Sequence, residues 1–324
     1  MKTNNLFLLY LLTAAYLYSQ AANGLQNFAI SESRILDRPL GRWNGLYFIP
    51  SAEESATVAN LQIFDGTGKE PRIIRYEIPG AVRVVFHDAT ALGSAIIVAA
   101  DIWEVGGIRA STIAAFDEKG QVLWMRRTNP FRAKFLTVAS DSTIWVFGQN
   151  IADSLNGLAQ DHDTLQVYRS DGQLLRTHAK ASLYGTQRLI RTDDSSKLGR
   201  SFLGSYQDRV VLLLANYQKW FEFSLDGRLL SSSNIPAPTE TIGTKEYPMK
   251  LFGTALTASG RLLANFRSSQ RWFFELDRKQ QKWVPITDLN PSRHVALWGA
   301  SGNQVLVSVD GPKGDWAYSW VTVQ

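Results

Sequence analysis

The chain of 324 residues contains no cysteine, only four histidines and only three methionines. Without cysteine there is no disulfide, no thiolate metal site and no lipid on a lipobox cysteine. The sequence also lacks an N-x-S/T sequon and the G-x-S-x-G, H-E-x-x-H and P-loop motifs. It has no run of five basic residues, and its formal net charge of +5 is mild. These absences argue against a nucleic-acid partner and against the enzyme classes that carry those motifs.

What is present indicates a folded, strand-rich protein. Hydrophobic residues make up 45% of the chain and aromatic residues 11%. That composition allows a large core and favours strands.

Residues 1–21 are predicted to be a secretory signal peptide. Lys2 gives a positive start, Leu6 to Tyr18 is an apolar stretch shorter than a membrane span, and Ser19-Gln20-Ala21 offers a small-residue cleavage site. The alternatives are an uncleaved anchor and a buried helix. The prediction is a secreted or periplasmic protein, held together by its core, with no transmembrane segment in the mature chain.

One phrase recurs along the chain, with an aromatic residue, a polar turn and a second extended run. Its turn positions are Gly68, Gly120, Gly172, Gly227 and Lys279, which lie 52, 52, 55 and 52 residues apart. The five copies read LQIFDGTGKE, AAFDEKGQVLW, QVYRSDGQLLR, FEFSLDGRLLS and FFELDRKQQKW. Each copy is predicted to be a β-hairpin whose glycine adopts a positive φ. A β-rich period near 50 residues indicates propeller blades.

Each period divides further into four extended runs. The second reads VRVVFHDA, SAIIVAADI, STIAAFD and QVLWMRR, and the fifth reads LFGTALTA, RLLANFR, WFFELD and KWVPITD. The sixth supplies HVALWGA, QVLVSVD and WAYSWVTVQ, and its fourth strand is expected from Asn27 to Ile30. The prediction is therefore all-β: residues 22–324 form a six-bladed β-propeller with four-stranded blades, closed by N- and C-terminal strands. Five blades, seven blades or two β-sandwiches are the alternatives.

On these turn phrases the chain resembles the broad NHL and TolB-like class of six-bladed β-propellers, over nearly the whole mature chain. The resemblance is architectural and implies no particular function. Phe116 to Trp124, FDEKGQVLW, is similar to a quinoprotein blade motif, but it occurs once in that form.

The residues that open each innermost strand are expected to line one mouth of the central channel. Each predicted opening carries a basic residue, and these six form the predicted ligand-binding set: Arg34, Arg83, Arg132, Arg188, Lys250 and Arg293. A ring of cations in a walled cleft attracts anions, and arginine grips carboxylate, sulfate or phosphate with two hydrogen bonds. The aromatic residues Trp103, Tyr184 and Tyr247 are candidates to flank a flat ligand. The alternative is that these basic residues are scattered over the surface.

Three further groups are weaker candidates. Asp161, His162 and Asp163 form a polar cluster suited either to a cation or to capping its own loop. His87 and His294 are candidate proton carriers, although a core histidine bonded to the backbone is the alternative for His87. The long segments Ile151 to Thr164 and Asn234 to Lys250 are expected to be loops available to a partner.

Two functions from different classes remain open. The first is an exported binding or scaffolding module for an anionic small molecule, a glycan or a protein partner, without cofactor or metal. The second is a hydrolase or lyase, either lactonase-like with a divalent cation or acting on an acidic polysaccharide. Only Glu32, Asp88 and Asp141 lie near the predicted openings, so the sequence offers a poor oxygen shell for a cation.

Overall fold

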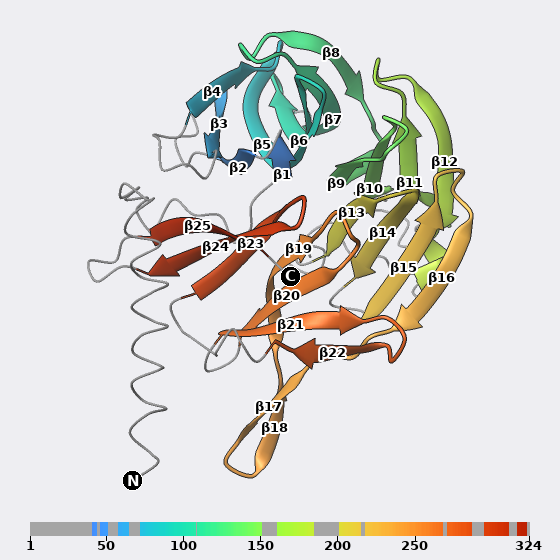
Figure 1. Ribbon diagram of the computed structural model, residues 1–324. Helices are drawn as coiled ribbons and strands as arrows, with labels where there is room; N and C mark the ends of the chain where they lie inside the picture. The colour runs from blue at the N-terminus through green and yellow to red at the C-terminus, as the bar shows by residue number, and fades with distance from the viewer. Residues whose placement is uncertain are drawn as a thin grey trace.

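The residues that the computed structural model describes form mainly antiparallel strands (Figure 1). These are residues 41–43, 46–50, 58–64, 72–107, 109–150, 161–184, 201–214, 218–267, 271–286, 295–310 and 316–322. Within these ranges the helical content is one short 3-10 turn, η2 (Ala181–Tyr184). Within the same ranges no helix has the length and apolar character needed to cross a membrane.

Five sheets of the described chain have four strands each, in chain order from one edge to the other. Sheet one holds β1 (Gly41–Trp43), β2 (Leu46–Pro50), β3 (Val58–Phe64) and β4 (Arg72–Glu77). Sheet two holds β5 (Ala81–Leu92), β6 (Ala95–Glu104), β7 (Arg109–Phe116) and β8 (Val122–Arg127). Sheet three holds β9 (Phe131–Val138), β10 (Ile144–Asn150), β11 (Asp163–Tyr168) and β12 (Leu174–Lys180).

Sheet four holds β13 (Phe202–Tyr206), β14 (Arg209–Leu214), β15 (Lys219–Ser224) and β16 (Leu229–Asn234). Sheet five holds β19 (Lys250–Leu256), β20 (Leu262–Arg267), β21 (Arg271–Asp277) and β22 (Lys282–Pro285). Sheet six has three described strands, β23 (Val295–Ser301), β24 (Gln304–Asp310) and β25 (Trp316–Thr322). The four extended runs predicted in the second and fifth periods are confirmed as β5–β8 and β19–β22.

The sheets follow one another around a centre, with the first strand of each sheet on the inside (Figure 1). Strand β1 contacts β5, β5 contacts β9, β9 contacts β13, β13 contacts β19, and β19 contacts β23. We call the surface between two successive sheets a seam. Apolar side chains fill these seams, as Ile97 and Ile113 of sheet two do against Phe131 and Leu136 of sheet three. The middle strands are buried on both faces, which explains their nearly continuous apolar runs.

The recurring turn glycine has two structural reasons, and the predicted positive φ is confirmed where the turn is described. Gly120, Gly172 and Gly227 have φ values of 83°, 80° and 90°. A Cβ on Gly172 would lie 2.6 Å from the Trp124 ring of sheet two, and one on Gly227 would lie 2.1 Å from the His178 ring of sheet three. Each of these two glycines therefore also lets the outer strand of the preceding sheet pack onto its hairpin.

The fifth phrase has no glycine, and its turn has a positive φ at Gln281 (53°), with Asp277 Oδ1 accepting the Lys279 and Gln280 amides. One detail of the prediction was wrong. The segment expected as a loop from Asn234 to Lys250 contains a two-stranded hairpin, β17 (Thr239–Ile242) and β18 (Lys245–Pro248), which projects from the ring (Figure 1).

Two of the predicted strand openings, Arg34 and Arg188, lie outside the described residues. The described strands that follow them in the chain, β1 and β13, begin at Gly41 and Phe202. Gly68, the strand expected from Asn27 to Ile30 and the predicted signal peptide lie outside the described residues.

Candidate functional site

A row of two arginines and one tryptophan crosses sheet two at the end where β5 begins. Arg83 on β5 lies directly opposite Trp103 on β6, and Trp103 lies directly opposite Arg109 on β7. Directly opposed residues share one face of a sheet, so the three side chains form a continuous row. The guanidinium carbons of Arg83 and Arg109 lie 4.9 and 5.1 Å from the centroid of the Trp103 ring. We call this group the arginine row; both of its arginines are exposed.

A buried ion cluster lies next to this row, one step further along the strands. Asp101 is 1% exposed, and its Oδ2 lies 2.5 Å from Arg109 Nη2 and 2.8 Å from Arg132 Nε. Arg132 Nη2 binds the same oxygen. Arg109 belongs to sheet two and Arg132 to sheet three, so Asp101 ties the two sheets together across their seam. Two guanidinium groups share one carboxylate here, which leaves the pair of arginines only half neutralised by Asp101.

Two β-bulges bring a histidine and a lysine to the same place. The register of β5 with β6 passes from Phe86↔Ala100 to Asp88↔Ala99, so His87 is the extra residue. The register of β9 with β10 skips Lys134 in the same way. A bulge re-aims the side chain that it carries. Lys134 Nζ lies 2.9 Å from His87 Nε2, and both groups face Asp101 Oδ2, at 3.9 and 2.9 Å. Asp101, His87, Arg109, Arg132 and Lys134 are called the Asp101 cluster below.

The other carboxyl oxygen of Asp101 is the unusual feature of this cluster. Oδ1 is buried and has no hydrogen-bond partner among the described residues. An unpaired buried acceptor costs about 1–3 kcal/mol. Buried polar atoms in folded proteins are nearly all paired, so such an atom points either to a ligand or water or to a functional compromise.

Asp88, next to His87, has a structural role. Its Oδ2 accepts the Leu136 amide of β9 at 2.8 Å, and its Oδ1 accepts the Ala89 amide at 3.0 Å. The carboxylate thereby joins β5 to β9 where the bulge interrupts the strand ladder. Both of its oxygens are therefore engaged with backbone amides.

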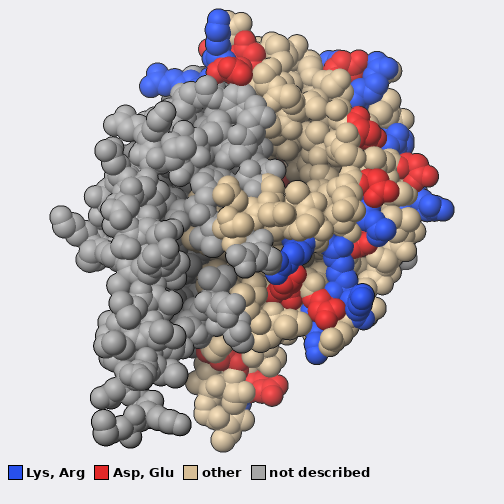
Figure 2. All heavy atoms as spheres, in the orientation of Figure 1, with Lys and Arg blue, Asp and Glu red and all other residues tan. Residues whose placement is uncertain are grey.

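The predicted cation set is only partly brought together. Arg83 and Arg132 lie at the seam between sheets two and three, whereas Lys250 is exposed at the start of β19 in sheet five. Arg34, Arg188, Arg293 and His294 lie outside the described residues. Figure 2 shows lysine and arginine mixed with acidic residues over the visible face of the described chain, which agrees with scattered surface charge beyond this seam.

The three aromatic residues predicted to flank a ligand lie in three different environments. Trp103 belongs to the arginine row. Tyr184 cannot flank a ligand, because it is 1% exposed and its hydroxyl lies 2.6 Å from Thr164 Oγ1 in the core. Tyr247 is 44% exposed on the hairpin β17–β18.

Nearby groups of the protein bind the side chains of Asp161, His162 and Asp163. Asp161 accepts two hydrogen bonds from Ser182, at 2.9 and 2.8 Å, and these bonds lower the pKa of its carboxyl. His162 Nε2 accepts the Asn150 amide at 3.0 Å. Asp163 pairs with Lys180 at 3.1 Å. The three side chains face different partners, and no group of three metal-ligating residues occurs in the part of the chain that the structure describes.

Sequence reasoning missed the centre of the site. Asp101 is the single acid inside the apolar run AIIVAADIW, and a lone charge in a buried strand is a signal that it has a partner. Arg109 carries no such signal. Arg83 and Trp103 were named from the sequence, but their alignment with Arg109 depends on the register of three strands.

No protein-family model matches the chain, and no curated protein matches it. Among solved structures, the chain is similar to YjhT, with a TM-score of 0.54 and 11% identity over 93% of this chain and 97% of that one. It is similar to a luciferin-regenerating enzyme, with a TM-score of 0.51 and 10% identity over 92% and 96% of the two chains. A puromycin hydrolase matches with a TM-score of 0.50 and 12% identity over 86% of this chain, which spans 42% of that protein. These neighbours are β-propeller proteins, and together with the repeated four-stranded sheets they show a β-propeller fold.

Proposed function

We propose that this protein is an exported six-bladed β-propeller that binds an anionic small molecule at the seam between sheets two and three. Six blades are supported by the series of contacts between the first strands of successive sheets, and sheet six is expected to gain its fourth strand from Asn27 to Ile30. Export is supported by the apolar segment Leu6 to Tyr18 with its positive start and small-residue end.

The observation that carries the binding proposal is the arginine row beside a single shared carboxylate. Arg109 and Arg132 both direct their guanidinium groups at Asp101 Oδ2, so one negative charge faces two positive ones. Arg83, the other exposed arginine of the row, stands beside this excess, and both arginines of the row lie against Trp103. A ligand carboxylate, sulfate or phosphate would complete the charge balance and receive paired N–H donors.

The same geometry favours binding over proton transfer. Both ring nitrogens of His87 lie within 3.4 Å of Lys134 Nζ, and Nε2 also faces Asp101. A general base must present a nitrogen to the substrate. Here the ring is directed at buried groups of its own cluster, so we assign His87 to holding Lys134 and Asp101 in place.

Calorimetric titration of the full chain with sulfate, phosphate, succinate and galacturonate tests this proposal. Arg109→Gln should weaken binding of the best anion at least tenfold, because a charged hydrogen bond contributes about 1.5–3 kcal/mol. Arg127→Gln is the matched control: it removes an arginine of the same sheet that pairs with Glu104 instead. The affinity of Arg127→Gln for the anion should equal that of the unmodified chain.

Two results would contradict the proposal. One is that no anion of the panel binds at low ionic strength. The other is that Arg109→Gln and Arg127→Gln lose the same affinity, which would show only the general effect of net charge.

A further inference from the structure

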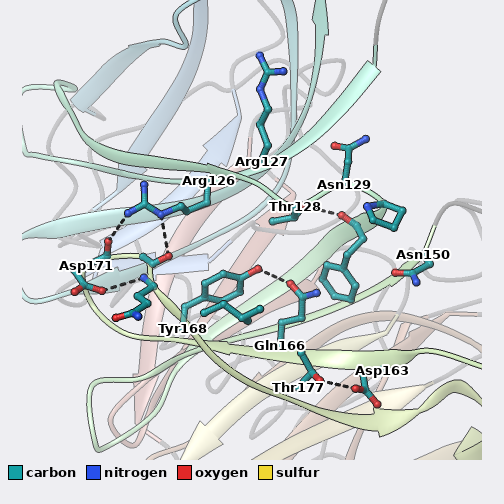
Figure 3. Close-up of a pocket in the computed structure, with 15 residues that line it drawn as sticks. Arg126, Arg127, Thr128, Asn129, Asn150, Asp163, Gln166, Tyr168, Asp171 and Thr177 are labelled. Atoms are coloured by element: carbon teal, nitrogen blue, oxygen red, sulfur yellow. Dashed lines mark hydrogen bonds between the residues drawn. The ribbon is translucent and has the colours of Figure 1, made fainter.

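A second candidate site lies on the same seam, toward the outer strands of the two sheets. A pocket of about 830 Å³ opens between the outer parts of sheets two and three. Its volume lies within the range of small-molecule sites, roughly 300–1,000 Å³. Figure 3 shows residues from β8 and the loop after it on one side and residues of sheet three on the other. Two amides, Asn129 and Gln166, carry the argument.

Both amides have their oxygen atoms engaged within the protein. The Ser111 backbone amide can only donate, and it donates to Asn129 Oδ1 at 2.7 Å. The Tyr168 hydroxyl donates to Gln166 Oε1 (Figure 3). The Ser111 amide fixes the orientation of the Asn129 side chain, so its NH₂ group is the end that remains for a ligand. With Tyr168 donating to Oε1, Gln166 likewise presents its NH₂ group. One donor comes from the loop after sheet two and the other from sheet three.

The pocket also offers acceptors, and its charges balance. Its lining contains two arginines, Arg126 and Arg127, and two aspartates, Asp163 and Asp171, so the formal charge is +2 − 2 = 0. Asp163 is fixed by a 2.5 Å hydrogen bond from the Thr177 hydroxyl and by Lys180 Nζ, 3.1 Å from its Oδ1. The lining itself is formally neutral, whereas the Asp101 cluster carries excess positive charge.

A hydroxyl group both donates and accepts, so a polyol meets both kinds of group at once. A peptide added as an extra strand fits less well, because β11 is already paired with β10 and β12 on its two edges. The apolar parts of Pro130 and Leu174 in the lining suit the C–H faces of a sugar ring. We infer that this pocket binds a neutral oligosaccharide, held by the Asn129 and Gln166 amide N–H groups and by the Asp163 carboxylate.

The test uses the full chain on an array of neutral oligosaccharides, followed by titration with the best sugar. Asn129→Asp and Gln166→Glu together keep both oxygens that accept the internal hydrogen bonds and remove both outward NH₂ donors. The double variant should keep its melting temperature within a few degrees and lose at least tenfold in sugar affinity. Gln121→Glu, the same change on the exposed β7–β8 turn, should leave the affinity unchanged.

Sugar binding that survives the double variant would overturn the inference, as would binding to none of the neutral oligosaccharides. Binding of an unstructured peptide library in preference to sugars, lost in the double variant, would also overturn it and make the pocket a peptide site. Arg109→Gln should not change sugar affinity, so the two sites can fail independently.

Discussion

Two seams of this propeller each bury one carboxylate between two arginines, and they differ in how completely that carboxylate is hydrogen-bonded. Between sheets four and five, Glu222 is 5% exposed. Its Oε1 faces Trp220 Nε1 and Arg278 Nη1, both at 3.2 Å, and its Oε2 accepts from Arg209 Nη1 at 3.0 Å. Arg278 also lies 4.7 Å from the centroid of the Tyr206 ring. Both oxygens are used, and the network is closed.

Between sheets two and three the same types of residue leave the network open. All the described contacts of the Asp101 carboxylate fall on Oδ2, and the buried Oδ1 has no partner among the described residues. The comparison teaches that a buried ion pair alone does not mark a functional site. The Asp101 cluster differs from the Glu222 network in this incomplete pairing and in the exposed arginines beside it.

The largest effect is expected from neutralising the two carboxylates. Asp101→Asn should lower the free energy of unfolding by about 3–5 kcal/mol, because it leaves the buried Arg132 without its counter-charge. Glu222→Gln should cost less, about 1–3 kcal/mol, because the side chains of Arg209 and Arg278 are 42% and 31% exposed and can be hydrated. Urea unfolding of both variants measures the difference.

Sulfate sharpens the same comparison. It should raise the melting temperature of Asp101→Asn more than that of Glu222→Gln, because only the former lacks an anion at buried cations. Equal losses of stability, with equal responses to sulfate, would show that the two seams are equivalent.

A smaller effect is expected from adding one methyl group to the closed seam. A Cβ on Gly260 would lie 2.5 Å from the Tyr206 ring, which packs in the Glu222 network. Gly260→Ala should therefore lower the free energy of unfolding by about 2–4 kcal/mol, because alanine is strained at a left-handed φ and its Cβ would displace the Tyr206 ring. Gly243→Ala on the hairpin β17–β18 also has a positive φ but meets nothing within 4 Å, so it should lose about 1 kcal/mol. If thermal unfolding gave similar losses of stability for Gly260→Ala and Gly243→Ala, the Tyr206 ring would be shown to move aside at little cost.

The smallest effect concerns His178, whose ring stacks on Trp145 of its own sheet, with centroids 6.0 Å apart, and lies against Gly227 of sheet four. Burial lowers the pKa of His178 below its usual 6.5, with Arg176 adding to the effect. The unfolded chain therefore binds this proton more readily than the folded chain. The contribution of His178 to stability is complete above about pH 6.5 and falls as the pH is lowered from there.

His178→Asn should make the melting temperature modestly less sensitive to pH between pH 7 and 5. Comparing the two melting curves at each pH cancels the carboxylates that titrate in the same range. If His178→Asn left the pH dependence of the melting temperature unchanged, the lowered pKa of His178 in the folded chain would be contradicted.

Much of the fold could be predicted from the sequence because its causes are local. The repeated turn phrase fixed where Gly120, Gly172 and Gly227 would turn the chain, and the apolar runs between them indicated the strands. The openings at Arg34 and Arg188 stay predictions, because both residues lie outside the described residues.

The candidate site could be predicted only in part. Arg83 and Arg132 were named from the sequence, but their relation to Asp101 and Arg109 depends on strand register and on two bulges. A bulge adds one residue to one strand without a signature in composition, so the approach of His87 to Lys134 could not be read from either strand alone.

The sequence by itself determined the repeat, the strand-rich architecture and the turns, since a hydrophobic period and a glycine with positive φ act within a few residues. Only the tertiary structure decided that Asp101 meets cations from two sheets, that Glu222 is fully paired, and that two amides face one pocket. These are contacts between segments about 30 or more residues apart in most cases, and their geometry is set by how neighbouring sheets pack.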